Sequence, residues 1–130
     1  MNSRDKGKRG EREIVKLLDE VLERVYGEGK PLIQRNTLQS HQGGYDIIGI
    51  DWLAIEVKFQ EKDFDKKWWE QCVRQAGESQ QPTLFFRRTR QPWKVMIQIT
   101  LHKPVPVVMN IEDWLEYFEW SLECQKETKI

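Results

Sequence analysis

The feature of this sequence that most restricts its fold is the segment 45–60, which reads YDIIGIDWLAIEVKFQ. Residues 53–59 alternate between apolar and other side chains, and a period of two predicts a strand. The isoleucine-rich run at 47–50 predicts a shorter strand before it, because β-branched residues favour extended structure. A tight connection at 51–52 joins the two strands. The segment therefore predicts a β-hairpin around which the other elements are arranged.

Three charged side chains are expected on one face of this hairpin. Residues two apart in a strand share a face, so Glu56 and Lys58 project together, and the hairpin brings Asp46 beside them. The opposite face is apolar, with Leu53, Ile55, Val57 and Phe59. Carboxylate oxygens suit Mg²⁺, which binds proteins through one or two carboxylates. The pattern therefore predicts either a divalent metal site with a lysine beside it or a solvated face that carries an ion pair.

Two motifs in the chain resemble those of a known enzyme family. Asp46, followed on the next strand by Glu56-x-Lys58, resembles the PD-(D/E)XK nuclease signature, although Tyr45 stands where that signature has proline. Residues 6–12, KGKRGER, resemble the K-G-x-x-x-E-R opening of the archaeal-type Holliday-junction resolvases and their phage relatives. The two motifs occur in the order found in that family, and the resemblance covers roughly residues 6–90.

The resemblance implies a role for each residue of these motifs. Asp46 and Glu56 would bind Mg²⁺, or Mn²⁺ in its place, together with the carbonyl oxygen of Val57. Lys58 would position the nucleophile. Glu11 would be a further ligand or would hold the attacking water. Such a metal ion can polarise a phosphodiester and lower the pKa of a bound water, so the implied chemistry is hydrolysis.

Glu11 also stands out by its place in a helix predicted at about 8–26. The apolar residues of this helix recur at helical spacing and form one stripe, made of Ile14, Leu17, Leu18, Val21, Leu22 and Val25. Glu11 lies one turn before the stripe, from where a carboxylate could reach the sheet, whereas Glu13 points elsewhere. An alternative is that Glu11 is a first-turn acid favoured by the helix dipole. Residues 1–7 are polar and are expected to be flexible.

Two basic clusters are candidates for contact with DNA phosphates. They hold Lys6, Lys8, Arg9 and Arg12 near the N-terminus, and Arg87, Arg88, Arg90 and Lys94 at the turn between two predicted strands. Equally, such charges can simply solvate a surface. The polar loop 36–44 is expected to be flexible and to contact DNA. By the resemblance, Arg35 is the nearest candidate for the arginine at the end of the strand before this loop, and Ser40 for the serine near the scissile phosphate. His41 could be a general base, although an exposed loop histidine is more often inert.

A second helix is predicted at about 64–78, with Asp63 or Asp65 as its cap. Its tryptophans share helical spacing with Cys72, which favours a core face over a surface that stacks on bases. Related nucleases often place a glutamine of this helix near the metal site, and Gln75 or Gln71 could fill that role or be a surface amide. Strands are predicted at 31–35, 82–88 and 93–101, an extended segment at 104–109, and a last helix capped by Asn110.

Length and composition limit the remaining possibilities. A chain of 130 residues corresponds to one domain. Its 21 basic and 21 acidic residues cancel, which excludes a protein that holds nucleic acid by bulk charge. Its two cysteines have no zinc spacing, and Cys72 fits a packing residue of a reduced, cytosolic protein. No signal peptide or membrane span is expected, so we expect a cytoplasmic location in a bacterium or a phage-infected cell.

These patterns predict a single α/β domain spanning residues 1–130, with a restriction-endonuclease-like core in which helices flank a mixed central β-sheet. The expected function is that of a metal-dependent, structure-specific DNA endonuclease resembling a Holliday-junction resolvase, plausible for a phage or prophage. A homodimer is expected, because a four-way junction offers two equivalent cuts. The alternatives are another nuclease on the same core, such as an exonuclease or a nicking enzyme, and a non-catalytic DNA-binding accessory protein.

Overall fold

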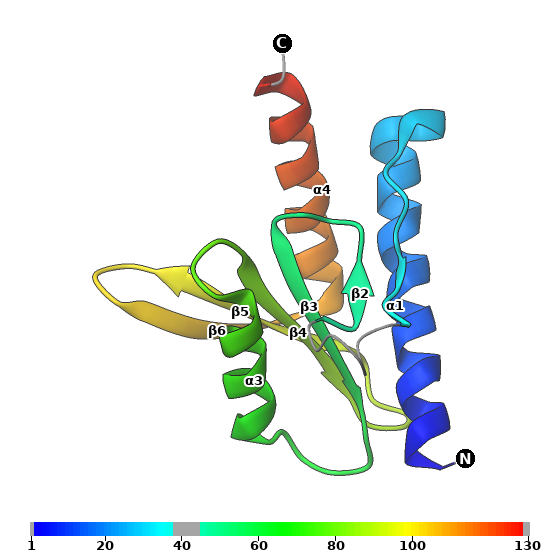
Figure 1. The fold of residues 1–130 in the computed structure, drawn as a ribbon, viewed down its shortest axis with the longest axis vertical. Coiled ribbons are helices and arrows are strands. Elements are labelled where there is room, and N and C mark those ends of the chain that lie inside the picture. The colour runs from blue at the N-terminus through cyan, green and yellow to red at the C-terminus, as the bar shows by residue number, and fades with distance from the viewer. Residues whose placement is uncertain (1, 38–44, 129–130) are drawn as a thin grey trace.

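The computed structural model describes residues 2–37 and 45–128. Within these residues the chain forms one six-stranded sheet with helices on both faces (Figure 1). The elements in chain order are α1 (Ser3–Tyr26), the 3₁₀-helix η1 (Gly27–Gly29), β1 (Gln34–Arg35), β2 (Ile47–Ile48), β3 (Leu53–Phe59), α3 (Lys66–Ala76), β4 (Gln81–Arg87), β5 (Lys94–Thr100), β6 (Pro104–Asn110) and α4 (Ile111–Thr128). The strands lie in the sheet in their sequence order.

The sheet is mixed, with β3 and β4 parallel and the other neighbouring strands of the described chain antiparallel. Parallel neighbours need a crossover connection, and α3 provides it over one face of the sheet. α1 and α4 pack together and cover the other face (Figure 1). This arrangement confirms the predicted α/β fold, which is consistent with a restriction-endonuclease-like core.

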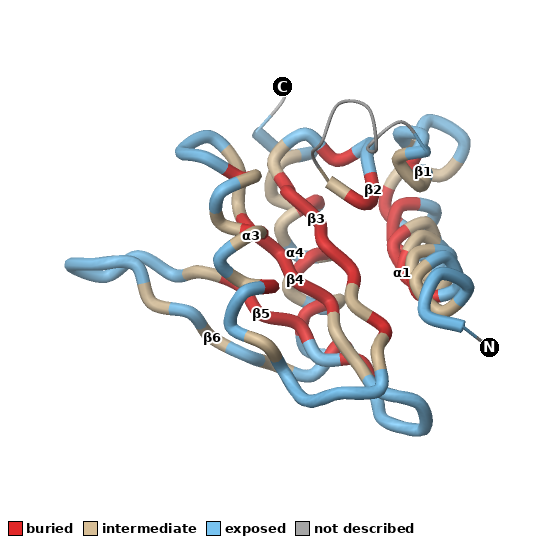
Figure 2. Tube along the Cα trace, turned by 60° about the horizontal axis from the view of Figure 1, so that its bottom comes forward, coloured by how far each residue is buried: buried red, intermediate tan, exposed pale blue. Residues whose placement is uncertain are grey.

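The hydrophobic core is divided unequally between the two faces. On the larger side, the predicted stripe of α1 packs against β3 and against α4, and the Trp114 ring centroid lies 5.0 Å from those of Phe85 and Phe118. On the smaller side, α3 covers a cluster made of Trp68, Cys72, Leu84 and Met96. Figure 2 shows the buried segments concentrated in the central strands and on the inner side of α1. The central strands are therefore buried on both faces.

The helix α1 packs closely on the sheet at Gly10. A Cβ atom at this position would lie 3.0 Å from the Cβ atom of Phe59 and 3.3 Å from Cγ1 of Val57. Such distances are shorter than ordinary contact, so a side chain here would force its neighbours to shift, and glycine lets the helix pack this closely without that shift. The close packing also carries the next residue, Glu11, toward the sheet.

Several predicted boundaries are corrected by the structure. α1 begins at Ser3 rather than at about 8, because the side chain of Asn2 accepts a hydrogen bond from the backbone N–H of Asp5 and caps the helix. The strand predicted at 31–35 is reduced to Gln34–Arg35. Its partner β2 is equally short, because Gly49 has a φ of 125° and turns the chain away after Ile48. Of the two proposed caps, Asp65 is the one that caps α3, because its side chain accepts a hydrogen bond from the backbone N–H of Lys67.

Candidate active site

The predicted hairpin places Asp46 directly beside Glu56. Ile47 of β2 pairs with Ile55 of β3, and extending this register by one residue sets Asp46 opposite Glu56. The Asp46 N–H donates to the Ile55 carbonyl at 2.9 Å, and the Val57 N–H donates to Oδ2 of Asp46 at 2.8 Å. The Asp46 carboxylate is thus oriented by the backbone of β3 and does not depend on another side chain to hold it.

Both carboxyl groups are buried, at 6% exposure for Asp46 and 3% for Glu56. Burial raises the pKa of Glu56 to about 9, assisted by the charge of Asp46 and by a hydrogen bond with its side chain. Oε1 of Glu56 is buried without a hydrogen-bond partner among the described residues. An unsatisfied buried oxygen is costly, so this side chain has an unmet requirement for a donor or a cation.

Lys58 lies two residues beyond Glu56 on β3, on the same face of the strand, and is half-buried. Its charge lowers the pKa of Glu56, but less than burial and Asp46 raise it. Within the described part of the chain, no carboxylate is within ion-pair distance of Lys58 (all nine ion pairs there involve other residues). Its ammonium is therefore available to a phosphate or a water at this site.

Glu11 approaches the same site from α1. Burial raises the pKa of the Glu11 carboxyl, the hydrogen bond from Arg35 lowers it, and the Asp46 charge raises it again. Oε1 of Glu11 accepts from Nε of Arg35 at 2.9 Å. Glu13 points elsewhere, as predicted, because it accepts hydrogen bonds from Arg87 and from the indole of Trp93, each at 3.1 Å. The two glutamates of this turn therefore have different surroundings.

The donor set suits a hard divalent cation, although the groups do not form a closed cage. Asp46 and Glu56 offer carboxylate oxygens, which are the atoms that Mg²⁺ binds in proteins. Oε1 of Glu56 has no hydrogen-bond partner among the described residues and could coordinate such a cation. In residues 2–37 and 45–128, no three or more His, Cys, Asp or Glu side chains gather closely enough to hold a metal. The structure therefore brings the Asp46–Glu56 pair together, with Glu11 held by Arg35.

The α3 side of the site has two further polar groups. Sγ of Cys72 contacts the Ala54 carbonyl at 3.6 Å, and burial together with the negative charge of Glu56 raises the pKa of its thiol to about 12. Cys72 is thus a neutral packing residue, as predicted. Gln71 and Gln75 are both half-buried, and of the two it is Gln75 that has a buried side-chain oxygen without a hydrogen-bond partner in the described chain. The role of Gln75 or Gln71 beside the metal site stays a prediction.

Most of the basic side chains predicted to contact DNA have acidic partners in this structure. The pairs are Lys6–Glu61 at 2.7 Å, Arg9–Glu13 at 3.5 Å, Arg35–Glu11 at 2.9 Å, Arg87–Glu13 at 3.1 Å and Arg88–Asp63 at 2.9 Å. Lys8, Arg12, Arg90 and Lys94 are exposed, and no ion pair joins them to a described residue. Ser40 and His41 lie outside the described residues. These four exposed cations, together with Arg9 and Arg88 in their exposed ion pairs, are the predicted DNA contacts most open to a ligand.

Arg87 has a structural role that its place in a basic cluster did not indicate. Its guanidinium lies 4.0 Å from the ring centroid of Phe59 and donates to both carboxylate oxygens of Glu13. Its side chain is only 12% exposed. Arg87 therefore joins α1 to β3 and β4, and its removal would change packing as well as charge.

One comparison with known proteins decides the family. The chain matches the model of a family described as phage putative PDDEXK endonuclease, over residues 2–128. The chain belongs to this family. A search of curated proteins and a search of solved structures each found no match. The family match confirms the PD-(D/E)XK interpretation and the phage connection drawn from the motifs, and it identifies the protein as a nuclease of the endonuclease type.

Within this PD-(D/E)XK endonuclease, one site feature was missed although the sequence held a signal for it. Gly10 stands four residues before Ile14, at a position of the buried stripe of α1. Glycine disfavours a helix interior, so a glycine on the buried face of a long helix indicates close packing. No comparable signal marked the Glu13–Arg87 pair, whose members lie 74 residues apart in the chain.

Proposed function

We propose that this protein is a Mg²⁺-dependent endodeoxyribonuclease that cuts branched DNA as a homodimer, in the manner of a Holliday-junction resolvase. The observation that carries the proposal is the buried Asp46–Glu56 pair, with one unsatisfied carboxylate oxygen and Lys58 beside it, in a member of a phage endonuclease family. The K-G-x-x-x-E-R resemblance of residues 6–12 supports the narrower choice of a resolvase.

Each residue of the site has a defined part in this proposal. Asp46, Glu56 and the Val57 carbonyl would hold Mg²⁺ or Mn²⁺, which when bound polarises the phosphodiester and makes a bound water more acidic. Lys58 would orient the attacking water and balance charge on the phosphate. Glu11 would hold that water or act as a further ligand, once its pairing with Arg35 is exchanged. Glu56 must lose its proton to bind the metal, so metal binding releases a proton at neutral pH.

The proposed substrate follows from the balance of positive and negative charge in this chain. A protein with 21 basic and 21 acidic residues cannot hold DNA by bulk charge, so its binding depends on local clusters. A two-fold dimer would double the exposed cations of one subunit, such as Lys8, Arg12 and Arg90, and would contact two arms of a junction. The same symmetry would set two active sites on the two equivalent strands of a four-way junction. Such an enzyme would act in the cytoplasm of the infected cell.

One assay separates these possibilities. The purified protein is incubated with a labelled four-way junction, a fork and a linear duplex of equal length, in Mg²⁺, in Mn²⁺ or in EDTA. We expect metal-dependent cleavage, a dimer in sedimentation, and binding to the junction at least roughly 100-fold tighter than to duplex, or about 2.7 kcal/mol. A monomer that binds junction and duplex equally well would contradict the resolvase proposal and leave a general nuclease. Metal-independent binding without cleavage of any DNA would instead indicate an accessory protein.

A further inference from the structure

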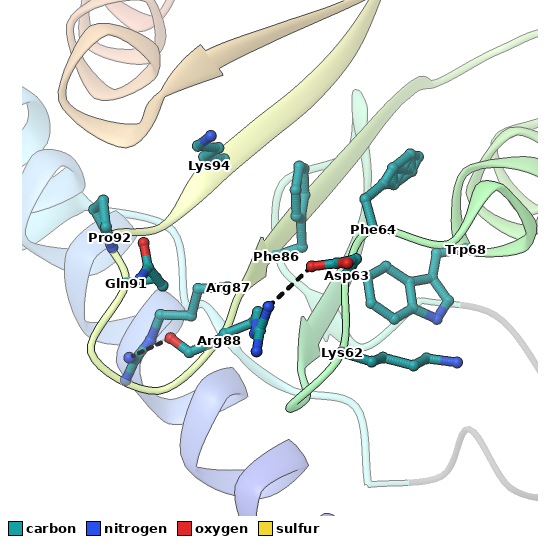
Figure 3. A pocket seen from close by; sticks show the side chains of 10 residues that line it. All are labelled: Lys62, Asp63, Phe64, Trp68, Phe86, Arg87, Arg88, Gln91, Pro92 and Lys94. Carbon is teal, nitrogen blue, oxygen red and sulfur yellow. Dashed lines mark hydrogen bonds and ion pairs between the residues drawn. The ribbon is translucent and has the colours of Figure 1, made fainter.

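A pocket of about 380 Å³ lies near the carboxyl ends of β3 and β4, outside the Asp46–Glu56 site (Figure 3). Its size is that of an ordinary small-ligand site. Its lining combines three aromatic side chains, Phe64, Trp68 and Phe86, with the basic side chains Lys62, Arg88 and Lys94. We call it the aromatic pocket. None of these six residues belongs to the proposed catalytic site.

The aromatic side chains form a continuous apolar surface. The rings of Phe64 and Phe86 are stacked, with centroids 5.4 Å apart and planes 28° from parallel, and Phe64 lies 6.1 Å from Trp68. Phe64 is 39% exposed, while Trp68 is 7% exposed and supports it from α3. An exposed aromatic ring held in place by other rings is the arrangement on which unpaired nucleic-acid bases stack.

The charges around these rings suit a phosphate. Lys94 is exposed, and no hydrogen bond or ion pair joins its side chain to another residue that the structure describes. Nζ of Lys62 lies 5.5 Å from the Trp68 ring centroid and 3.3 Å from Asp65. Arg88 pairs with Asp63, whose side chain is 93% exposed, and so exposed a pair contributes little and can be exchanged for a phosphate. Arg87 points away from these rings (Figure 3), and its guanidinium donates a hydrogen bond to Glu13.

The sheet register links the aromatic pocket to the catalytic face. Lys58 of β3 pairs with Phe86 of β4, and Phe86 pairs with Lys94 of β5, so these three side chains form one row across the sheet. Glu56 is two residues from Lys58 on the same face. Strand spacing puts the Cα atoms of Glu56 and Phe86 about 8 Å apart. A DNA strand at the catalytic carboxylates would therefore reach the aromatic pocket within one or two nucleotides.

We propose that the aromatic pocket binds an unpaired nucleotide of the same DNA strand that is cut, one or two nucleotides from the cleaved bond. Its base stacks on Phe64, and its phosphate contacts Lys94 and Arg88. Single-stranded DNA is favoured because the pocket joins an aromatic surface to a basic rim, and bases in an intact duplex cannot stack on a side chain. The inference rests on the proposed DNA-cleaving function and specifies the part of the substrate that must be unpaired.

The test measures binding without cleavage. Fluorescence anisotropy in EDTA gives the affinity for a labelled ten-nucleotide single strand and for a blunt duplex, with wild type, Phe64→Ala, Phe64→Tyr and Ile99→Ala. Ile99 is the matched control, because it is also 39% exposed but lies on the other sheet face. Loss of one stacked base predicts that Phe64→Ala lowers the preference for single strand over duplex by at least about 5-fold. Phe64→Tyr and Ile99→Ala are expected to keep the wild-type preference.

Two further variants make the result decisive. Phe64→Leu keeps an apolar side chain without the ring, so it tests stacking even if Phe64→Ala unfolds, and Lys94→Ala tests the rim. The proposal would be overturned if wild type, Phe64→Leu and Lys94→Ala bound single-stranded DNA with equal affinity. It would also be overturned if Ile99→Ala lost as much preference for single strand as Phe64→Ala. Asp46→Asn separates the two proposals, because it is expected to stop cleavage and keep single-strand binding. A wild-type protein that cuts no DNA but binds single strands through Phe64 would refute the nuclease proposal alone.

Discussion

The two faces of the central sheet differ in how much hydrophobic core they carry and in what lies beside it. The face under α1 and α4 carries the large core, in which Trp114, Phe85 and Phe118 are fully buried. The face under α3 carries a small core, and beside it lie Glu56 with an unsatisfied oxygen and the exposed ring of Phe64. Packing on the first face can offset the cost of buried charge on the second. Substitutions on the two faces are therefore expected to have different consequences.

The largest expected effect is the loss of DNA cleavage when a carboxylate of the α3 face is replaced and the fold is kept. Asp46→Asn and Glu56→Gln are each expected to lower the rate of DNA cleavage by about a thousandfold or more, since a metal ion supplies several kcal/mol of transition-state stabilisation. DNA binding should be kept or become tighter, because the variant lacks a charge that repels phosphate. Cleavage of labelled junctions in Mg²⁺ measures the rate, with Glu112→Gln on the exposed side of α4 as control. Near-wild-type cleavage by either variant would refute the metal-site assignment.

The second prediction concerns a substitution that removes a packed side chain from the opposite face of the sheet. Trp114→Ala is expected to lower the free energy of unfolding by about 3–5 kcal/mol, because it leaves a cavity between Phe85 and Phe118. Trp120 is the matched control, since it is the same residue type on the same helix but is 66% exposed. Trp120→Ala should change stability by less than about 0.5 kcal/mol. Urea titrations of both variants measure the difference, and equal losses would show that α4 does not form the core described here.

The third prediction concerns pH and the buried carboxyl pair. The pKa of Glu56 in the folded protein, about 9, is above its ordinary value of 4.5, so its stabilising contribution is present below pH 4.5 and is lost as the pH rises toward 9. Stability in EDTA should therefore fall between these values, by at most about 1.4 kcal/mol per pH unit. Glu56→Gln should show a flatter profile, and Mg²⁺ should stabilise the wild type more at pH 8.5 than at pH 6. Melting temperatures that change with pH in the same way in the wild type and in Glu56→Gln would contradict this prediction.

The fourth prediction separates the two glutamates of the first helix. Glu11→Gln is expected to lower cleavage by about 10- to 100-fold, as changes beside a metal site do. Glu13→Gln is expected to retain cleavage and to lose about 1–3 kcal/mol of stability, because Arg87 and Trp93 lose a charged acceptor. Cleavage rates at room temperature and melting temperatures of both variants give the comparison. A reversed order of the two rates would show that the catalytic role belongs to Glu13.

The smallest effect concerns exposed cations on the turn between β4 and β5. Arg88→Ala combined with Arg90→Ala should weaken binding of all DNA sequences to a similar degree, because phosphate contacts carry no base information. The slope of log affinity against log salt should become flatter by up to about 0.9 for each phosphate that the variant no longer neutralises. Arg87 is left intact because of its structural pairing with Glu13. An unchanged salt slope in gel-shift titrations would remove this turn from the DNA interface.

Local sequence patterns were sufficient to predict most of the elements and the central pair of carboxylates. The alternation of residues 53–59 and the stripe of α1 are such patterns, and secondary structure follows them closely. Asp46 and Glu56 could be placed together because a short hairpin leaves few ways to pair its strands. The start of α1 was missed, because a capping asparagine in a polar segment resembles any other polar residue.

Which charged side chains are available to a ligand depends on contacts between elements that are distant in the chain. Arg87 and Lys94 belong to one basic cluster in the sequence, yet Arg87 is held by Glu13 and Phe59 whereas Lys94 is exposed, next to Phe86 in the row that Lys58 begins. The aromatic pocket likewise joins Phe64 and Phe86 from segments that the crossover helix α3 separates. These contacts depend on the register between distant elements. That register is set by the packing of the whole core, which no local pattern records.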